Sequence, residues 1–302
     1  MSNQHSHGHG SQNYSKAFAV GIVLNLGFVV VEFYYGTIAH SLALVADAGH
    51  NLSDVLSLFL AWGAALLSRR SPTPNRTYGL RRSSILAALL NAVVLLIALG
   101  AISWESIRRL GEPSVVAEQT VMWVAALGIV INAATAVLFF SGRKGDVNIR
   151  GAFLHMASDA AVSAGVVVSA FVIGRTGWFW LDPAVSLLIC VAIFMGTWDL
   201  LKDSLNLALD AVPEGIEMSA VESYFSALPN VVGVHDLHVW GMSTTETALT
   251  THLVMNQPTC DNAFLIQIEK ELHNSFGIEH VTIQLETGDR DSPCRCRLSP
   301  IV

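Results

Sequence analysis

The chain has 302 residues, of which 52% are hydrophobic and only 14% are charged. Soluble globular domains carry about 25% charged residues, so an ordinary soluble protein is excluded. The formal net charge of −7 argues against a nucleic-acid partner bound through a broadly basic surface. Together with a mean hydropathy of +0.49, this composition indicates a membrane protein.

Six stretches are long and apolar enough to cross a bilayer, which requires about 20 residues per helix. They cover residues 17–35, 41–67, 85–103, 119–140, 151–174 and 178–198. We therefore predict an all-α transmembrane domain of six helices over residues 16–206. No secretory signal peptide is expected, because the first fifteen residues are polar and lack a basic start followed by a short apolar core.

The lysines and arginines of the short loops predict the orientation of these spans. One side collects Lys16, Arg69, Arg70, Arg76, Arg81, Arg82, Arg143, Lys144, Arg150 and Lys202. The other side has only Arg108, Arg109 and Arg175. Because basic loops stay in the cytoplasm, both termini are predicted to be cytoplasmic.

Charged and polar residues return after about residue 205. Hydrophobic periodicity predicts helices over residues 218–228 and 262–274, and strands over residues 231–240, 247–255 and 280–286. The order α-β-β-α-β predicts a small cytoplasmic α+β domain of the ferredoxin-like type, over residues 207–290. Residues 1–15 and 291–302 are predicted to be tails.

Two of the predicted spans carry the same polar motif, His-x-x-x-Asp. It joins His50 to Asp54 in one span and His155 to Asp159 in the other. A spacing of four places both side chains of a pair on one face of a helix. Two such helices in contact would bring together two imidazoles and two carboxylates, a tetrahedral ligand set that suits zinc. The two pairs reach the same depth in the membrane only if the helix that carries His155 begins near Arg143. We therefore predict that start.

Energetics favour a functional role for these pairs. An aspartate at the centre of a span costs about 2.5–3.5 kcal/mol on insertion scales. A divalent cation would balance two carboxylates, whereas burial without metal favours protonation. The same site can therefore bind metal or protons, which is the physical basis of an exchange.

Simpler interpretations exist for single residues of this kind. A buried histidine can be a hydrogen-bonding contact between helices, and an aspartate can pair with Asn25 or Asn132. The duplicated motif makes these alternatives the weaker ones. Asp47 shares a helical face with His50 and Asp54. It either supports the ligands or handles protons, or it only lies near the wet entrance of its helix, and these interpretations stay open.

The run from Ser41 to Asp54, Ser-Leu-Ala-Leu-Val-Ala-Asp-Ala-Gly-His-Asn-Leu-Ser-Asp, resembles the second-span signature of the cation diffusion facilitators. The run His-Met-Ala-Ser-Asp at 155–159 resembles the partner motif of that family. The six spans and the cytoplasmic domain extend the likeness over nearly the whole chain. Within the family, the chain is most similar to bacterial zinc exporters of the cobalt–zinc–cadmium resistance type.

This resemblance implies a homodimer in the bacterial inner membrane that exports divalent metal from the cytoplasm in exchange for protons, by alternating access. It assigns the transport site to His50, Asp54, His155 and Asp159. The histidine at position 50 resembles zinc-preferring members, with cadmium or cobalt as secondary substrates. No cofactor is implied, since zinc is the substrate and a regulatory ligand.

One loop departs from the family pattern. Some members bind another metal between the second and third spans through Asp and His, and residues 71–80 contain neither. We predict no metal site in this loop, whose arginines suit orientation and contact with anionic lipid.

Further ligand candidates lie outside the spans. By resemblance, His235, His252, Gln284 and Glu286 match positions that hold regulatory metal at the dimer interface. Strand alternation places His235 on the side of Leu237 and Val239, which predicts a core-facing side chain unless the strand begins after it. Ordinary surface histidines on a sheet are the alternative.

The two tails contain potential metal ligands. His5, His7 and His9 form a metal-binding tract by composition, and Cys294 and Cys296 offer two thiolates in a reducing compartment. These residues could capture zinc before transport. A polar leader with little affinity for metal is the alternative for the histidines.

Three functions compete. The leading hypothesis is a zinc/proton antiporter, which is not an enzyme. An intramembrane metal-dependent hydrolase would also use buried His and Asp ligands, but it needs a general base and an open coordination position. The usual His-Glu-x-x-His motif is absent from the sequence. A metal sensor anchored by its membrane part leaves the buried pairs unexplained and ranks last.

Overall fold

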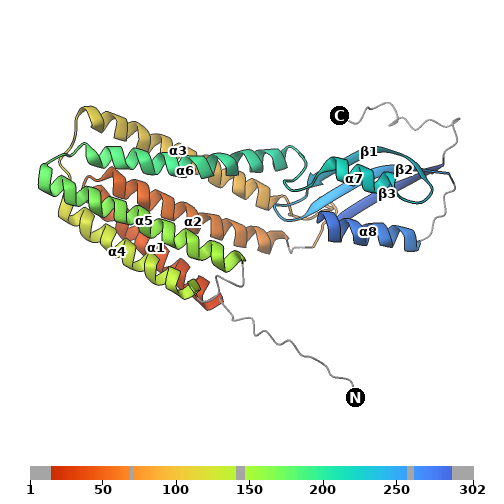
Figure 1. Ribbon diagram of the computed structural model, residues 1–302, viewed down its shortest axis with the longest axis horizontal. Helices are drawn as coiled ribbons and strands as arrows, with labels where there is room; N and C mark the ends of the chain where they lie inside the picture. The colour runs from red at the N-terminus through yellow and green to blue at the C-terminus, as the bar shows by residue number, and fades with distance from the viewer. Residues whose placement is uncertain (1–14, 69–70, 141–146, 257–261, 288–302) are drawn as a thin grey trace, which may run out of the picture. The chain divides into compact units, whose positions relative to one another are not determined.

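The computed structural model describes residues 15–68, 71–140, 147–256 and 262–287. The described residues form two compact units, one drawn from residues 15–58 and 93–197 and the other from residues 59–92 and 198–287. Six long helices come first in the chain, followed by a small domain of helices and strands (Figure 1). The six are α1 (Ser15–Ile38), α2 (Leu42–Ser68), α3 (Ser83–Gly111), α4 (Glu118–Phe140), α5 (Val147–Thr176) and α6 (Leu181–Ala208).

Each of the six apolar stretches forms a helix, but two helices extend well past the apolar part. α3 continues to Gly111 and α6 continues to Ala208, through charged residues such as Glu105 and Lys202. These residues are good helix formers, so the helix continues where the apolar run has ended. An apolar run marks the part of a helix that can lie in lipid, and it does not mark the end of the helix.

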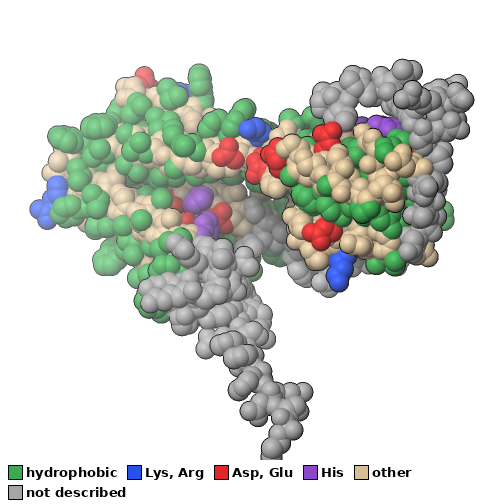
Figure 2. Space-filling model, turned by 45° about the vertical axis from the view of Figure 1, so that its right-hand side comes forward, with side chains coloured by type: hydrophobic (Ala, Val, Ile, Leu, Met, Phe, Trp, Pro, Cys, Tyr) green, Lys and Arg blue, Asp and Glu red, His purple; other side chains and the backbone are tan. Residues whose placement is uncertain are grey.

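Four of the described helices are long and apolar enough to cross a membrane. They are Ser83–Gly111, Glu118–Leu138, Phe153–Thr176 and Leu181–Ala208, and the apolar part of α1, Ile22–Ile38, is shorter. Figure 2 shows hydrophobic side chains over much of the surface of the helices, and Val23, Ile97 and Leu188 are among the most exposed of these. Six membrane crossings remain a prediction.

The core of the first unit is built from aliphatic and small side chains. Phe28 of α1, Leu44 of α2 and Val166 of α5 belong to one buried cluster. Gly128 of α4 lies where helices approach closely, because a Cβ there would meet the Phe28 ring at 2.6 Å and the Ser163 hydroxyl at 3.0 Å. Small residues let membrane helices approach in this way.

The start of α2 is held by a side chain of α6. Asp182 is 2% exposed. It accepts a hydrogen bond from the Ser41 hydroxyl, and its other oxygen accepts one from the backbone N–H of Leu42 at 2.7 Å. A carboxylate satisfies the free N–H groups at a helix N-terminus and also interacts favourably with the helix dipole.

The second unit contains the small domain, with α7 (Met218–Ser226), β1 (Val231–Gly241), β2 (Thr247–Met255), α8 (Asn262–Phe276) and β3 (His280–Thr287). The predicted order α-β-β-α-β is observed. The sheet has the order β1-β2-β3, with β1 antiparallel and β3 parallel to β2. Phe225 of α7 and Leu272 of α8 are buried with Leu249 and Leu253 of β2. The three described strands form a small α+β layer pair, and the ferredoxin-like assignment stays a prediction.

Replacing Asp182 tests the role of this side chain at the start of α2. Asp182→Ala leaves the Leu42 N–H and the Ser41 hydroxyl without their acceptor, which should cost about 1–3 kcal/mol. Asp182→Asn keeps one acceptor oxygen and should lose less. Thermal unfolding in detergent measures the effect. The unfolding temperature should be highest for the wild type, lower for Asp182→Asn and lowest for Asp182→Ala. An alanine variant as stable as wild type would contradict the assignment.

The helix crossing at Gly128 gives a second test. Gly128→Ala places a methyl group against Phe28, and overpacking of this kind costs about 1–3 kcal/mol. Gly100→Ala on α3 is the matched control, because nothing lies within 4 Å of the Cβ that it adds. The unfolding temperature should fall for the first variant and hold or rise for the second. Equal unfolding temperatures for the two variants would contradict the close packing at Gly128, because α4 would then have room for the added methyl group.

Candidate metal centre

The structure brings together the two His-x-x-x-Asp motifs of α2 and α5. His50 Nε2 lies 3.3 Å from Asp159 Oδ1, and His155 Nε2 lies 3.2 Å from Asp54 Oδ2. Within each helix, the corresponding distances are 3.9 Å for His50 and Asp54 and 3.7 Å for His155 and Asp159. Each imidazole therefore faces one carboxylate of its own helix and one of the other helix. We call these four side chains the His/Asp quartet.

The spacing of the quartet fits a small divalent ion. Zinc–nitrogen and zinc–oxygen bonds of about 2.0–2.2 Å place the ligands of a tetrahedron roughly 3.3–3.6 Å apart. The four nitrogen–oxygen distances of 3.2–3.9 Å bracket this value. The ligand atoms of His50, Asp54 and Asp159 all lie within 4.8 Å of one another. His155 is the outermost member, with its ring centroid 6.1 Å from that of His50.

Burial differs across the quartet. The Asp159 side chain is 2% exposed, whereas that of His155 is 41% exposed. Apart from the imidazole nitrogens 3.2–3.9 Å away, which donate only when they carry a proton, Asp54 Oδ2 and both carboxylate oxygens of Asp159 have no hydrogen-bond partner among the described residues. Figure 2 shows histidine and acidic side chains grouped within the hydrophobic surface of the helices. Buried acceptors that lack a donor need a cation or a proton.

The asparagine alternative does not match the contacts, whereas the imidazoles do contact carboxylates of the neighbouring helix. The amide of Asn25 donates to Met156 Sδ, at 3.6 Å. Neither side-chain atom of Asn132 has a hydrogen-bond partner among the described residues. Pairing of Asn25 or Asn132 with an aspartate of the two motifs is therefore wrong as an interpretation.

The predicted start of the helix that carries His155 is tested only in part. α5 begins at Val147, four residues before the apolar stretch that starts at Gly151. Arg143 lies outside the described residues. The helix does begin early enough to place His155 more than two turns inside it.

Asp47 forms a hydrogen bond with α5. Its Oδ2 accepts a hydrogen bond from the Ser163 hydroxyl at 3.1 Å. Close by, the amide of Asn51 donates to Glu32 Oε2 at 3.0 Å. Glu32 is a neighbour that the motif analysis missed, although a glutamate within an apolar span is itself a signal.

The loop between α2 and α3 uses two arginines in ion pairs of the second unit. Arg81 lies 3.1 Å from Glu246, and Arg82 pairs with Asp210. These two arginines therefore bind carboxylates of their own unit. That the loop lacks a metal site remains a prediction.

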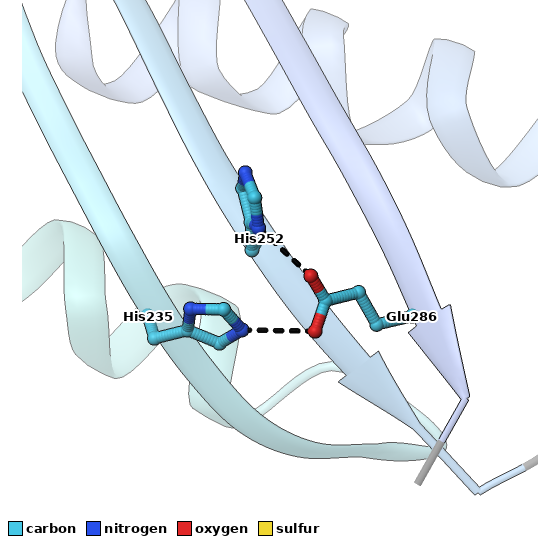
Figure 3. A group of neighbouring side chains, drawn as sticks. All are labelled: His235, His252 and Glu286. Carbon is cyan, nitrogen blue, oxygen red and sulfur yellow. Dashed lines mark hydrogen bonds and ion pairs between the residues drawn. The ribbon is translucent and has the colours of Figure 1, made fainter. Parts of the chain in front are cut away.

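A second cluster lies on the sheet of the small domain, with one residue from each strand (Figure 3). His235 Nε2 of β1 is 3.1 Å from one oxygen of Glu286 on β3, and His252 Nδ1 of β2 is 2.8 Å from the other. The ligand atoms of the three residues lie within 4.8 Å of one another. Gln284 donates its amide to Glu286 at 3.2 Å, so in this structure it orients the carboxylate.

The prediction that His235 faces the core is wrong, and a β-bulge explains the error. His235 pairs with His252 and His238 pairs with Thr250, so β1 has one more residue than β2 in this stretch. Asp236 is the extra residue of the bulge, and its φ is +53°. A bulge shifts the alternation of side chains by one. His235 therefore points to the same face as His252.

The remaining candidates cannot be placed. His5, His7, His9, Cys294 and Cys296 lie outside the described residues. Asp236, which no motif indicated, is an additional neighbour of the cluster, with Oδ2 3.6 Å from His252 Nε2.

Comparison with known families defines the class of protein. The family model of the cation efflux transmembrane domain matches residues 18–207, and that of the cation efflux cytoplasmic domain matches residues 213–288. The chain belongs to the cation efflux family, as its resemblance to the cation diffusion facilitators predicted. This family consists of metal cation transporters and not of enzymes, which removes the hydrolase alternative. The helices form a transmembrane domain, and the small sheet belongs to a cytoplasmic domain.

Individual relatives match along almost the whole chain. The metal cation efflux system protein CzcD of Cupriavidus metallidurans is 35% identical, over 96% of this chain and 90% of that protein. The cadmium, cobalt and zinc/H(+)-K(+) antiporter of Bacillus subtilis is 34% identical, over 94% and 92%. The zinc transporter ZitB of Escherichia coli is 35% identical, over 93% and 92%.

Proposed function

We propose that the protein exports zinc from the cytoplasm in exchange for protons, by alternating access around the His/Asp quartet. The observation that carries this proposal is the convergence of two imidazoles and two carboxylates from α2 and α5, at distances of 3.2–3.9 Å. The names of the relatives support it, because they include a zinc transporter and a cadmium, cobalt and zinc/H(+)-K(+) antiporter, whose name includes potassium beside protons. Cadmium and cobalt are proposed as secondary substrates.

Exchange follows from the chemistry of the four groups. Imidazole nitrogens and carboxylate oxygens bind either a metal ion or protons, and one kind of ligand excludes the other. When the site faces the cytoplasm, zinc displaces the protons. When it faces outward, protons displace zinc, and the protonated site returns. Each state leaves the buried carboxylates balanced by positive charge, which lowers the cost of holding them in lipid.

The proposed setting is a bacterial inner membrane, with six crossings and both termini in the cytoplasm. We propose a homodimer, because the second matched family domain is the cytoplasmic domain of cation efflux proteins and the resemblance implies pairing there. Residues 16–206 are proposed as the transport domain and residues 207–290 as the cytoplasmic domain.

Transport by Asp159→Asn tests the quartet. The substitution keeps the shape of the side chain but removes a ligand charge, so zinc transport into proteoliposomes should fall at least tenfold, by analogy with losses of about 10–100-fold for groups that only support ligands. Ser158→Ala is the matched control, because its exposed hydroxyl donates to the carbonyl of Leu154 in the same helix and lies outside the quartet. A zinc-sensitive dye inside the vesicles gives the rate. Wild-type transport by Asp159→Asn would overturn the proposed site.

The cytoplasmic cluster of His235, His252, Gln284 and Glu286 is proposed to bind a regulatory metal ion. Glu286 contacts both histidines, so its loss removes a ligand and releases both rings. The three strands would then lose the link that the ion makes between them.

Zinc stoichiometry tests this second site. Full-length Glu286→Ala in detergent should bind about one zinc fewer per chain than wild type, because structural zinc sites need a complete ligand set. Glu269→Ala, on the exposed face of α8, is the control. Titration calorimetry with zinc measures the difference. Equal stoichiometry in wild type and Glu286→Ala would leave the cluster as surface histidines paired with a glutamate.

A further inference from the structure

A second group of acidic side chains lies next to the His/Asp quartet and does not belong to it. Glu32 of α1 and Asp47 of α2 are both 0% exposed. Their carboxyl groups lie within hydrogen-bonding distance of each other. One oxygen of Glu32 accepts from Asn51, and one oxygen of Asp47 accepts from Ser163. Their other oxygens, Glu32 Oε1 and Asp47 Oδ1, find no donor among the described residues.

Two facing carboxyl groups of this kind need a proton. Ionised carboxylates are acceptors only, so two of them cannot form a hydrogen bond. Both would also be desolvated and would repel each other, the situation in which paired carboxyls retain one proton between them. A single proton supplies the missing donor and removes half of the negative charge.

Few groups around the pair could balance its negative charge in place of a proton. α2 contributes Asn51 and His50, and α5 contributes Ser163 and Asp159. Of these, only His50 can carry positive charge, and it already faces Asp159 at 3.3 Å. No lysine or arginine contacts Glu32 or Asp47 in the described part of the chain.

We propose that Glu32 and Asp47 form a proton-binding site that is coupled to zinc in the His/Asp quartet. This inference rests on the proposed exchange of zinc for protons. With the quartet empty of metal, the pair holds one proton. Zinc places two positive charges in the quartet, on the same face of α2 as Asp47, and it favours the ionised pair because it displaces fewer than two protons from the quartet itself.

The proton step is a simple dissociation. The O–H bond of the shared proton breaks, the electron pair stays on the carboxyl oxygen, and the proton leaves to water. Both groups are then carboxylates, with Asn51 and Ser163 still donating to them. When zinc leaves, a proton from water restores the hydrogen bond between them.

The coupling predicts how many protons zinc releases. Glu32→Gln keeps the shape of the side chain and gives Asp47 a permanent N–H donor, so the pair no longer needs a proton. The purified variant should still bind zinc, and it should release about one proton fewer per zinc than wild type. A pH-indicator dye in weakly buffered detergent solution measures the release. Glu118→Gln at the start of α4 is the control and should match wild type.

The outcomes separate this inference from the proposed function. If wild type releases protons and Glu32→Gln releases the same number, the coupled pair is wrong and the exchange stands. If wild type releases no proton on binding zinc, both are wrong. Asp47→Asn, which supplies the donor from the other side, provides the same measurement if Glu32→Gln does not fold. The same reduction in Asp47→Asn supports the pair, and unchanged release overturns it.

Discussion

The cost of keeping negative charge among apolar helices governs the arrangement of the transmembrane domain. Each buried carboxylate needs hydrogen-bond donors, a cation or a proton. The structure meets this need in three ways. Asp182 accepts from the Ser41 hydroxyl and from the first backbone N–H of α2. Asp54 and Asp159 face two imidazoles. Glu32 and Asp47 face each other.

These three solutions differ in how readily they can change. Backbone N–H groups cannot be lost without unwinding a helix, so the carboxylate at the start of α2 is a fixed part of the structure. An imidazole can lose its proton, and an ion can replace it. A proton shared by two carboxyls can leave when another positive charge arrives. The carboxylates proposed to function in transport are therefore those whose negative charge is balanced by a proton or an ion that can leave.

Much of this arrangement follows from residue spacing. Four residues separate His50 from Asp54 and His155 from Asp159, and that spacing alone places each pair on one helical face. The contact between α2 and α5 could not be obtained from spacing, because it depends on packing of the whole bundle. Glu32 shows the same limit, since its partners Asp47 and Asn51 come from another helix. The alternation that predicted His235 in the core failed because one extra residue at Asp236 shifts the strand.

The hydrogen bonds at the start of α2 also constrain how the quartet can open. Asp182 holds Ser41 and Leu42, and Arg109 of α3 donates to the carbonyl of the preceding residue, His40, at 2.7 Å. One end of the helix that carries His50 and Asp54 is thereby fastened to both α3 and α6. If the proposed alternating access moves α2 away from α5, this anchored end would be the pivot and the opposite end would move farther.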